Sequence, residues 1–156
     1  MKLKFISLPT HTVRALQAGC PDANGQHPEK QTSGGMGECR HCLRMIPEGE
    51  DMLVLAYRPF TTVQPYAEVG PIFLCAKTCP PHAESHDLPT MFEDWEHVLV
   101  RGYDENEHIV YGSGQIVKKS DMTSIISTAF KTQENIAFFH VRSAGNNCYE
   151  CRVERG

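Results

Sequence analysis

Apolar residues along this chain gather in short runs, and most of the runs are bounded by Gly, Pro, Asn or Asp. Runs of this kind, rich in Val, Ile, Phe and Tyr, are typical of β-strands. No run approaches the ~20 apolar residues that a membrane-spanning helix needs. The runs predict strands at 1–9, 51–58, 72–75, 96–103, 108–111, 136–143 and 148–153.

The helical pattern is clearest after Asp121, which can cap a helix start and is followed by four apolar side chains on one helix face. These four residues are Ile125, Ile126, Ala129 and Phe130. A shorter helix is expected at 12–18, between Thr10, which can cap its start, and Gly19, which would end it.

Strands outnumber helices in this pattern, and neighbouring strands follow one another as hairpins. The sequence therefore predicts an α+β fold with an antiparallel or mixed sheet of about six strands and one main helix packed on it. A single domain over 1–156 is expected, because a chain of this length buries roughly 70% of its unfolded surface. The segment 19–38 is rich in Gly, Pro, Asn, Gln and Ser, which predicts a long loop that is free to move.

Composition and charge exclude several kinds of partner. The net charge of −4 gives no electrostatic reason to expect nucleic acid or an acidic membrane as a partner. The apolar residues at the N-terminus are interrupted by Pro9, His11 and Arg14, well short of the 7–15-residue core of a secretory signal. We therefore expect a soluble, cytoplasmic protein.

The chain contains seven cysteines, an odd number without an export signal, which favours reduced thiols or metal ligands over disulfides. Cys39 and Cys42 have the spacing that lets two thiolates in a tight turn face one tetrahedral ion. Cys75 and Cys79 are the first candidate partners, with His82 as a substitute for either of them. Together the two cysteine pairs predict a four-thiolate zinc site.

A third pair, Cys148 and Cys151, has the same spacing as Cys39 and Cys42 but lies in a predicted strand. Residues three apart in a regular strand point to opposite faces, so both thiols could reach one ion only across a bulge. The geometry therefore favours the pair at 75 and 79 for the metal. Cys148 is expected to be a single thiol near Cys39.

The strands 136–143 and 148–153 are predicted to form a hairpin around a tight turn at Gly145 and Asn146. This turn places Arg142 opposite Tyr149 and His140 opposite Cys151. One face of the sheet then carries an unusually polar group of residues, which are candidates for ligand binding or redox chemistry. They are His140, Arg142, Tyr149 and Cys151, and the neighbouring imidazole and guanidinium could make Cys151 a thiolate.

Four segments carry a family resemblance: Gly-Glu-Cys-Arg-His-Cys-Leu-Arg at 37–44, Pro-Tyr-Ala-Glu-Val-Gly-Pro-Ile-Phe at 65–73, Arg-Gly-Tyr-Asp at 101–104, and His-Val-Arg-Ser-Ala-Gly-Asn-Asn-Cys-Tyr-Glu-Cys-Arg-Val-Glu-Arg at 140–155. With them the chain resembles the domain-of-unknown-function 1203 family. The resemblance implies a bacterial, intracellular, stand-alone domain and supplies no activity. Among the thiols outside the predicted metal site, it favours Cys148 as a functional residue.

Three functions remain open at this point. The first is a zinc-stabilised binding or adaptor protein whose partner is a small molecule or a protein. The second is a thiol redox protein or sensor that cycles a Cys-x-x-Cys disulfide. The third is a metal-free domain that binds a small ligand around His140, Arg142 and Tyr149. No catalytic residue is predicted, because neither a Gly-x-Ser-x-Gly elbow nor a phosphate-loop lysine occurs.

Overall fold

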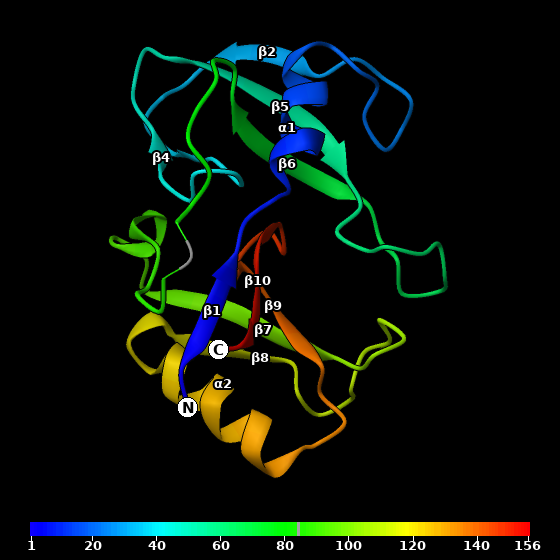
Figure 1. Ribbon diagram of the computed structural model, residues 1–156. Helices are drawn as coiled ribbons and strands as arrows, with labels where there is room; N and C mark the ends of the chain where they lie inside the picture. The colour runs from blue at the N-terminus through cyan, green and yellow to red at the C-terminus, as the bar shows by residue number, and fades with distance from the viewer. Residues whose placement is uncertain (84) are drawn as a thin grey trace.

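The computed structural model describes residues 1–83 and 85–156, and it confirms the α+β class (Figure 1). The described chain forms two α-helices, α1 (Thr10–Gln17) and α2 (Met122–Thr132), and two short 3₁₀ helices, η1 (Thr90–Phe92) and η2 (Lys119–Asp121). Its strands are β1 (Leu3–Ile6), β2 (Glu29–Thr32), β3 (Gly37–Glu38), β4 (Met45–Ile46), β5 (Asp51–Tyr57), β6 (Gly70–Cys75), β7 (His97–Tyr103), β8 (Gln115–Lys118), β9 (Phe138–Ser143) and β10 (Tyr149–Arg155).

These strands form three antiparallel sheets, so the prediction of one sheet of about six strands was wrong. The largest has the order β1-β10-β9-β7-β8, the second has the order β2-β5-β6, and β3 pairs with β4 alone. The strand β2 lies within 19–38, where composition predicted only a loop, and pairs with β5. The apolar pattern missed β2 because all four of its residues are exposed.

The predicted strand at 108–111 was also wrong, because this segment makes only an isolated bridge between Tyr103 and Ile109. The partner of β7 in the sheet is instead β8, which begins at Gln115. A serine hydroxyl at 113 donates to the carbonyl oxygens of Val110 and Gly102, which holds the intervening segment close to β7.

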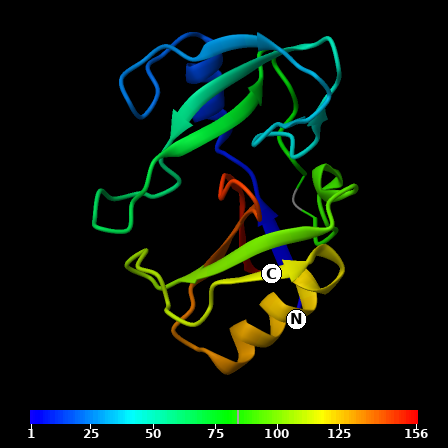
Figure 2. The ribbon, with the colours of Figure 1, turned by 180° about the vertical axis from the view of Figure 1, so that it is seen from behind.

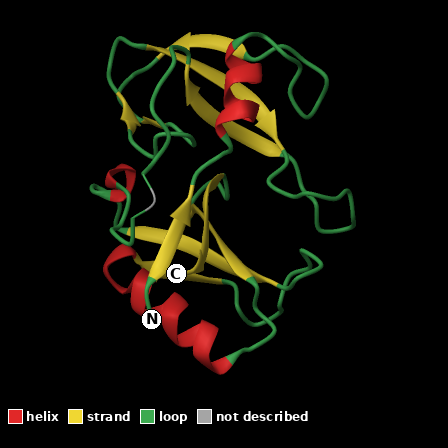
Figure 3. Ribbon diagram, in the orientation of Figure 1, coloured by secondary structure: helices red, strands yellow, loops and turns green. Residues whose placement is uncertain are grey.

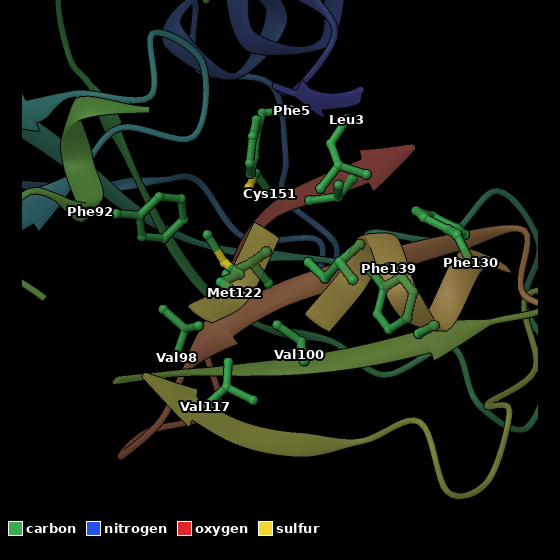
Figure 4. Packing of buried hydrophobic residues seen from close by; sticks show 14 of the residues in the cluster. Leu3, Phe5, Phe92, Val98, Val100, Val117, Met122, Phe130, Phe139 and Cys151 are labelled. Atoms are coloured by element: carbon green, nitrogen blue, oxygen red, sulfur yellow. The ribbon is translucent and has the colours of Figure 1, made fainter. Parts of the chain in front are cut away.

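The five-stranded sheet and α2 form one half of the molecule, which we call the α2 half. The predicted apolar face of α2 lies against this sheet, with Ile126 and Phe130 buried. Strands β7, β9 and β10 complete the same core from the opposite side, and Figure 4 shows Val100, Phe139 and Cys151 within it. This core depends on none of the four cysteines that were predicted to bind metal.

The three-stranded sheet, α1 and the β3–β4 pair form the other half, the α1 half, which lies at the top of Figure 1. Its core is smaller than that of the α2 half, and α1 contributes Val13 and Leu16 to it. Figure 3 shows α1 against the three-stranded sheet and α2 against the five-stranded sheet, and Figure 2 shows from behind how the chain passes from β1 up into α1. A small core of this kind has more to gain from an additional crosslink.

The loop at 58–69 connects β5 to β6 and reaches from the α1 half onto the five-stranded sheet. Phe60 packs there against Tyr103 and His140, with ring centroids 5.4 and 5.1 Å apart. The carboxylate of Glu107 accepts hydrogen bonds from the backbone N–H groups of residues 61 and 62. The loop therefore covers the sheet face that points away from α2.

The predicted hairpin of β9 and β10 is confirmed, and its turn end has the predicted register. The Ser143 N–H donates to the Cys148 carbonyl oxygen at 3.0 Å. Arg142 lies opposite Tyr149, as expected.

Beyond Tyr149 the register shifts, because a β-bulge at Glu150 inserts one extra residue into β10. His140 consequently pairs with Arg152, and Val141 pairs with Cys151. The prediction that His140 lies beside Cys151 was therefore wrong. The carboxylate of Glu150 is buried and lies 3.0 Å from the guanidinium of the buried Arg40.

Candidate metal centre

Cys39 and Cys42 lie in a tight turn between β3 and β4. The N–H of Cys39 donates to the Arg44 carbonyl oxygen, and the N–H of Leu43 donates to the Cys39 carbonyl oxygen, both at 2.9 Å. Leu43 closes the turn in the left-handed region, with φ of 52°. This conformation is uncommon for a branched residue and curls the backbone so that both thiols point the same way.

Cys75 and Cys79 lie at the end of β6 and in the loop that follows it. Helix α1 holds this loop in place through two side chains. The Arg14 guanidinium donates to the Cys79 carbonyl oxygen at 2.7 Å, and the Gln17 amide donates to the carbonyl oxygens of Cys75 and Lys77 at 2.8 and 2.9 Å. The second cysteine pair is therefore positioned by the α1 half itself.

The two pairs meet in one cluster. The sulfur atoms of Cys39, Cys42, Cys75 and Cys79 all lie within 4.8 Å of one another, and those of Cys39 and Cys79 are 3.9 Å apart. Four thiolates at ~2.3 Å from a tetrahedral zinc ion would be separated by roughly 3.8 Å. Three of the four residues are buried and Cys75 is half-buried. The cluster is therefore close enough to hold a metal ion and is compatible with zinc.

Hydrogen bonds within the cluster favour negative charge on Cys39. The thiols of Cys42, Cys75 and Cys79 lower the pKa of Cys39, and the backbone N–H of Cys75 also donates to its sulfur at 3.3 Å. The same interaction with Cys39 raises the pKa of Cys75 and of Cys79. Four thiols this close share their protons unevenly, and a bound cation would replace those protons.

His41 lies between the two cysteines of the turn and was not identified as a functional residue from the sequence. Its Nδ1 is 3.1 Å from the Cys79 sulfur, and its Nε2 is 3.0 Å from the Thr10 hydroxyl. Burial lowers the pKa of His41, so the ring is neutral and can donate one hydrogen bond to the Cys79 sulfur while accepting one from Thr10. The sequence feature that could have identified His41 is its position between the two cysteines of the Cys-x-x-Cys motif.

The third cysteine pair is divided between two environments, as expected, but not because of a regular strand. Cys148 lies before β10 begins, and the bulge separates it from Cys151. Cys151 is fully buried in the core of the α2 half, where burial raises the pKa of its thiol. The prediction of a Cys151 thiolate beside His140 was therefore wrong. Cys148 lies at the hairpin turn and lines a hollow of about 200 Å³ together with Arg142 and Tyr149. It is not part of the four-cysteine cluster.

The other three ligand candidates do come together. His140 and Tyr149 have ring centroids 4.8 Å apart, and the neighbouring strand positions place Arg142 on the same sheet face. Burial, followed by the charges of nearby arginines, lowers the pKa of His140 and keeps its ring neutral. This group lies on the sheet face covered by the 58–69 loop, outside the cysteine cluster.

A buried ion cluster joins the cysteine turn to the five-stranded sheet. The Arg40 guanidinium lies 3.0 Å from the carboxylate of Glu150 and 3.5 Å from that of Glu38, and it donates to the Tyr149 carbonyl oxygen at 2.7 Å. Arg40 and Glu150 are each 1% exposed. Burial raises the pKa of Glu150 to about 8, although Arg40 acts in the opposite direction.

The fold and the site together define an α+β domain that carries a buried cluster of four cysteines. Residues 37–155 match the family model described as protein of unknown function (DUF1203), and the chain belongs to this family. The predicted resemblance is confirmed over that range. No curated protein and no solved structure matches the chain. Neither α-helix of the described chain combines the length and the apolar character that a membrane crossing requires.

Proposed function

We propose that the protein is a zinc-stabilised binding or adaptor domain in which Cys39, Cys42, Cys75 and Cys79 hold one structural ion. The observation that supports this proposal is the approach of all four sulfurs to within 4.8 Å of one another. Cysteine residues from a turn and from a distant loop converge there, which is how structural zinc sites are commonly built.

A structural role is favoured over a catalytic one by the chemistry of the donor set. Catalytic zinc sites keep one coordination position open for water or substrate, whereas four thiolates fill a tetrahedral ion. The proposed ion would connect the β3–β4 turn to the loop after β6. Both segments border the core of the α1 half, so the ion would add crosslinks to the smaller of the two main cores.

Metal analysis of the full chain, purified without a histidine tag, tests this proposal. We expect one zinc ion per chain, with Cys20 and Cys148 reacting with a thiol reagent in the native protein. The four cluster thiols should become reactive only after chelation. The redox alternative instead predicts metal-free protein in which cluster thiols titrate directly and form a reversible disulfide, and that result would contradict the zinc proposal.

Replacing His41 by alanine is expected to weaken zinc binding by roughly 10–100-fold, the usual effect of losing a side chain that hydrogen-bonds a metal ligand. The variant would lose the contact of 3.1 Å between Nδ1 and the Cys79 sulfur. Competition with a chromophoric chelator measures the affinity directly.

The matched control for this variant is His11→Ala, which removes an exposed imidazole from the start of α1. Its zinc affinity should equal that of the unmodified protein. If His41→Ala and His11→Ala bind zinc equally tightly, His41 has no role in supporting the site.

A further inference from the structure

Two arginines of the five-stranded sheet converge on a single carboxylate oxygen. The Nη2 atoms of Arg101 and Arg142 each lie 2.7 Å from Oε1 of Glu68. The side chain of Arg142 is 4% exposed and that of Arg101 is 19% exposed, whereas Glu68 is 41% exposed. The two cations are therefore enclosed by the fold, and the anion that joins them approaches from the solvent side.

The cations and the anion are held by different kinds of structure. Arg101 lies on β7 and Arg142 on the adjacent strand β9, on the face that points away from α2. Glu68 belongs to the 58–69 loop, two residues before β6 begins. A loop can move away from a sheet with far less disruption than a strand can leave it, so this carboxylate is the replaceable member of the group.

The group has an excess of positive charge and of hydrogen-bond donors. Two guanidiniums share one carboxylate, and the Nε atoms of Arg101 and Arg142 are buried without a hydrogen-bond partner in the described chain. The hydroxyl of Tyr103 and both ring nitrogens of His140 are likewise buried without partners. A buried donor without a partner is costly because it has lost its hydrogen bonds to water, so this arrangement favours the entry of a further acceptor.

These polar groups belong to one continuous patch of the sheet. Arg101 lies directly opposite His140 in the pairing of β7 with β9, and the rings of His140 and Tyr103 are 4.6 Å apart. Arg142 and Glu68 also line the hollow of about 200 Å³ that contains Cys148. This volume suits a small anion and is below the usual range for drug-sized ligands.

We infer that Arg101 and Arg142 form a binding site for a small oxyanion bearing a carboxylate or a phosphate group, and that Glu68 occupies this site as an internal competitor until the ligand displaces it. Paired guanidiniums are the side chains best suited to planar recognition of either group. The inference goes beyond the proposed zinc-stabilised function and does not depend on it, because the site shares no residue with the cysteine cluster.

Internal competition has a measurable consequence. If Glu68 fills the site most of the time, the apparent affinity for an added anion is reduced by the fraction of time that the site is free. Glu68→Gln removes the competing charge and keeps the size of the side chain. We expect this variant to bind inorganic phosphate or succinate at least tenfold more tightly than the unmodified chain.

The experiment titrates the full chain with each anion separately at constant ionic strength, and follows the Nε–H resonances of the arginines by NMR. Signals that move with phosphate alone identify a phosphate ligand, and signals that move with succinate identify a carboxylate ligand. Glu50→Gln is the matched control, because it removes the same charge from the exposed pair of Lys77 and Glu50, 3.2 Å apart. This control should not change the affinity for either anion.

A second substitution, placed in the Glu68→Gln background, tests the arginines. Arg101→Gln should abolish the gain in affinity. Arg101 is chosen because it is less deeply buried than Arg142, so the fold should tolerate its replacement better. The inference is overturned if Glu68→Gln binds both anions no more tightly than the unmodified chain, or if the gain survives Arg101→Gln. The first result would leave the three residues as an ion cluster that only stabilises the 58–69 loop, and the second would show that the anion binds without Arg101.

Discussion

Chelation of the metal, or the substitution Cys39→Ser, is expected to lower the free energy of unfolding by about 4 kcal/mol. Structural zinc contributes ~10–16 kcal/mol to isolated zinc-finger peptides, and less to a domain that already has an apolar core. For a chain of this length, the expected loss corresponds to a decrease of roughly 8–16 °C in the melting temperature. Thermal unfolding with and without EDTA measures it.

The loss should be concentrated in one part of the molecule. Cys39, Cys42 and Cys79 belong to the core of the α1 half, whereas the core of the α2 half contains none of the four ligands. Hydrogen exchange should therefore become faster in α1, β5 and β6, and remain slow in β9.

The matched control is Cys20→Ser, which makes the same atomic change at an exposed cysteine outside the cluster. It should melt at the temperature of the unmodified protein in the presence of zinc. If the chelated protein also melts at that temperature, the four cysteines do not hold a structural ion.

The position of the cysteine cluster could be predicted because its determinants are local. A Cys-x-x-Cys turn curls two thiols to one side, and a strand that ends shortly before two prolines leaves its last cysteines free to turn. The separation of Cys148 from Cys151 was also expected, but from a regular strand that a turn and a bulge replace in the structure. Helix α2 was predicted on equally local grounds, from Asp121 at its start and an apolar stripe.

The division into separate sheets could not be predicted in this way. Alternation of apolar and polar residues identifies a strand but not the neighbours with which it pairs. The strand β2 is an edge strand with four exposed residues. It is held by backbone pairing with β5, and its side chains carry no apolar pattern that would reveal it. The bulge at Glu150 lies beside Arg40, which is far away in the sequence, so no local pattern indicates it.

Two contacts that were not predicted join residues far apart in the sequence. Arg40 donates to the carbonyl oxygen of a residue 109 positions later. Glu68 and Arg101 lie 33 positions apart, one in the 58–69 loop and the other on β7. Each of these residues belongs to a segment that carries the family resemblance, yet nothing in the spacing of those segments indicates that their charged side chains meet.

Replacing Arg40 by methionine is expected to destabilise the fold by about 3–5 kcal/mol, the usual loss when one partner of a buried ion cluster is removed. Methionine fills most of the volume of arginine, but it leaves the carboxylates of Glu38 and Glu150 without their shared cation. The Tyr149 carbonyl oxygen also loses its donor. Urea unfolding measures the change, and Arg44→Met at an exposed position of the same turn should have little effect.

The size of this loss should depend on pH. The pKa of Glu150 is raised from 4.5 to about 8, so between these values the folded protein keeps a proton that the unfolded chain releases. Stability of the unmodified protein therefore falls as the pH rises through this window, and this contribution levels off above pH 8. Without Arg40 the pKa rises further, so the decline continues to higher pH, and the destabilisation should be larger at pH 9 than at pH 6.

The double substitution Arg40→Met with Glu150→Gln separates this charge effect from the loss of packing. In the Glu150→Gln background no carboxylate is present at position 150, so Arg40→Met should reduce the stability by the same amount at pH 6 and pH 9. The loss in free energy of unfolding should also be smaller in this background than in the unmodified chain. The difference should be about 0.5–3 kcal/mol, the range typical of residues in one ionic network. An equal pH dependence in both backgrounds would show that Glu150 does not carry the raised pKa. If Arg40→Met costs the same stability in the unmodified chain and in the Glu150→Gln background, Arg40 stabilises the junction of the two halves through its size and its backbone contacts alone.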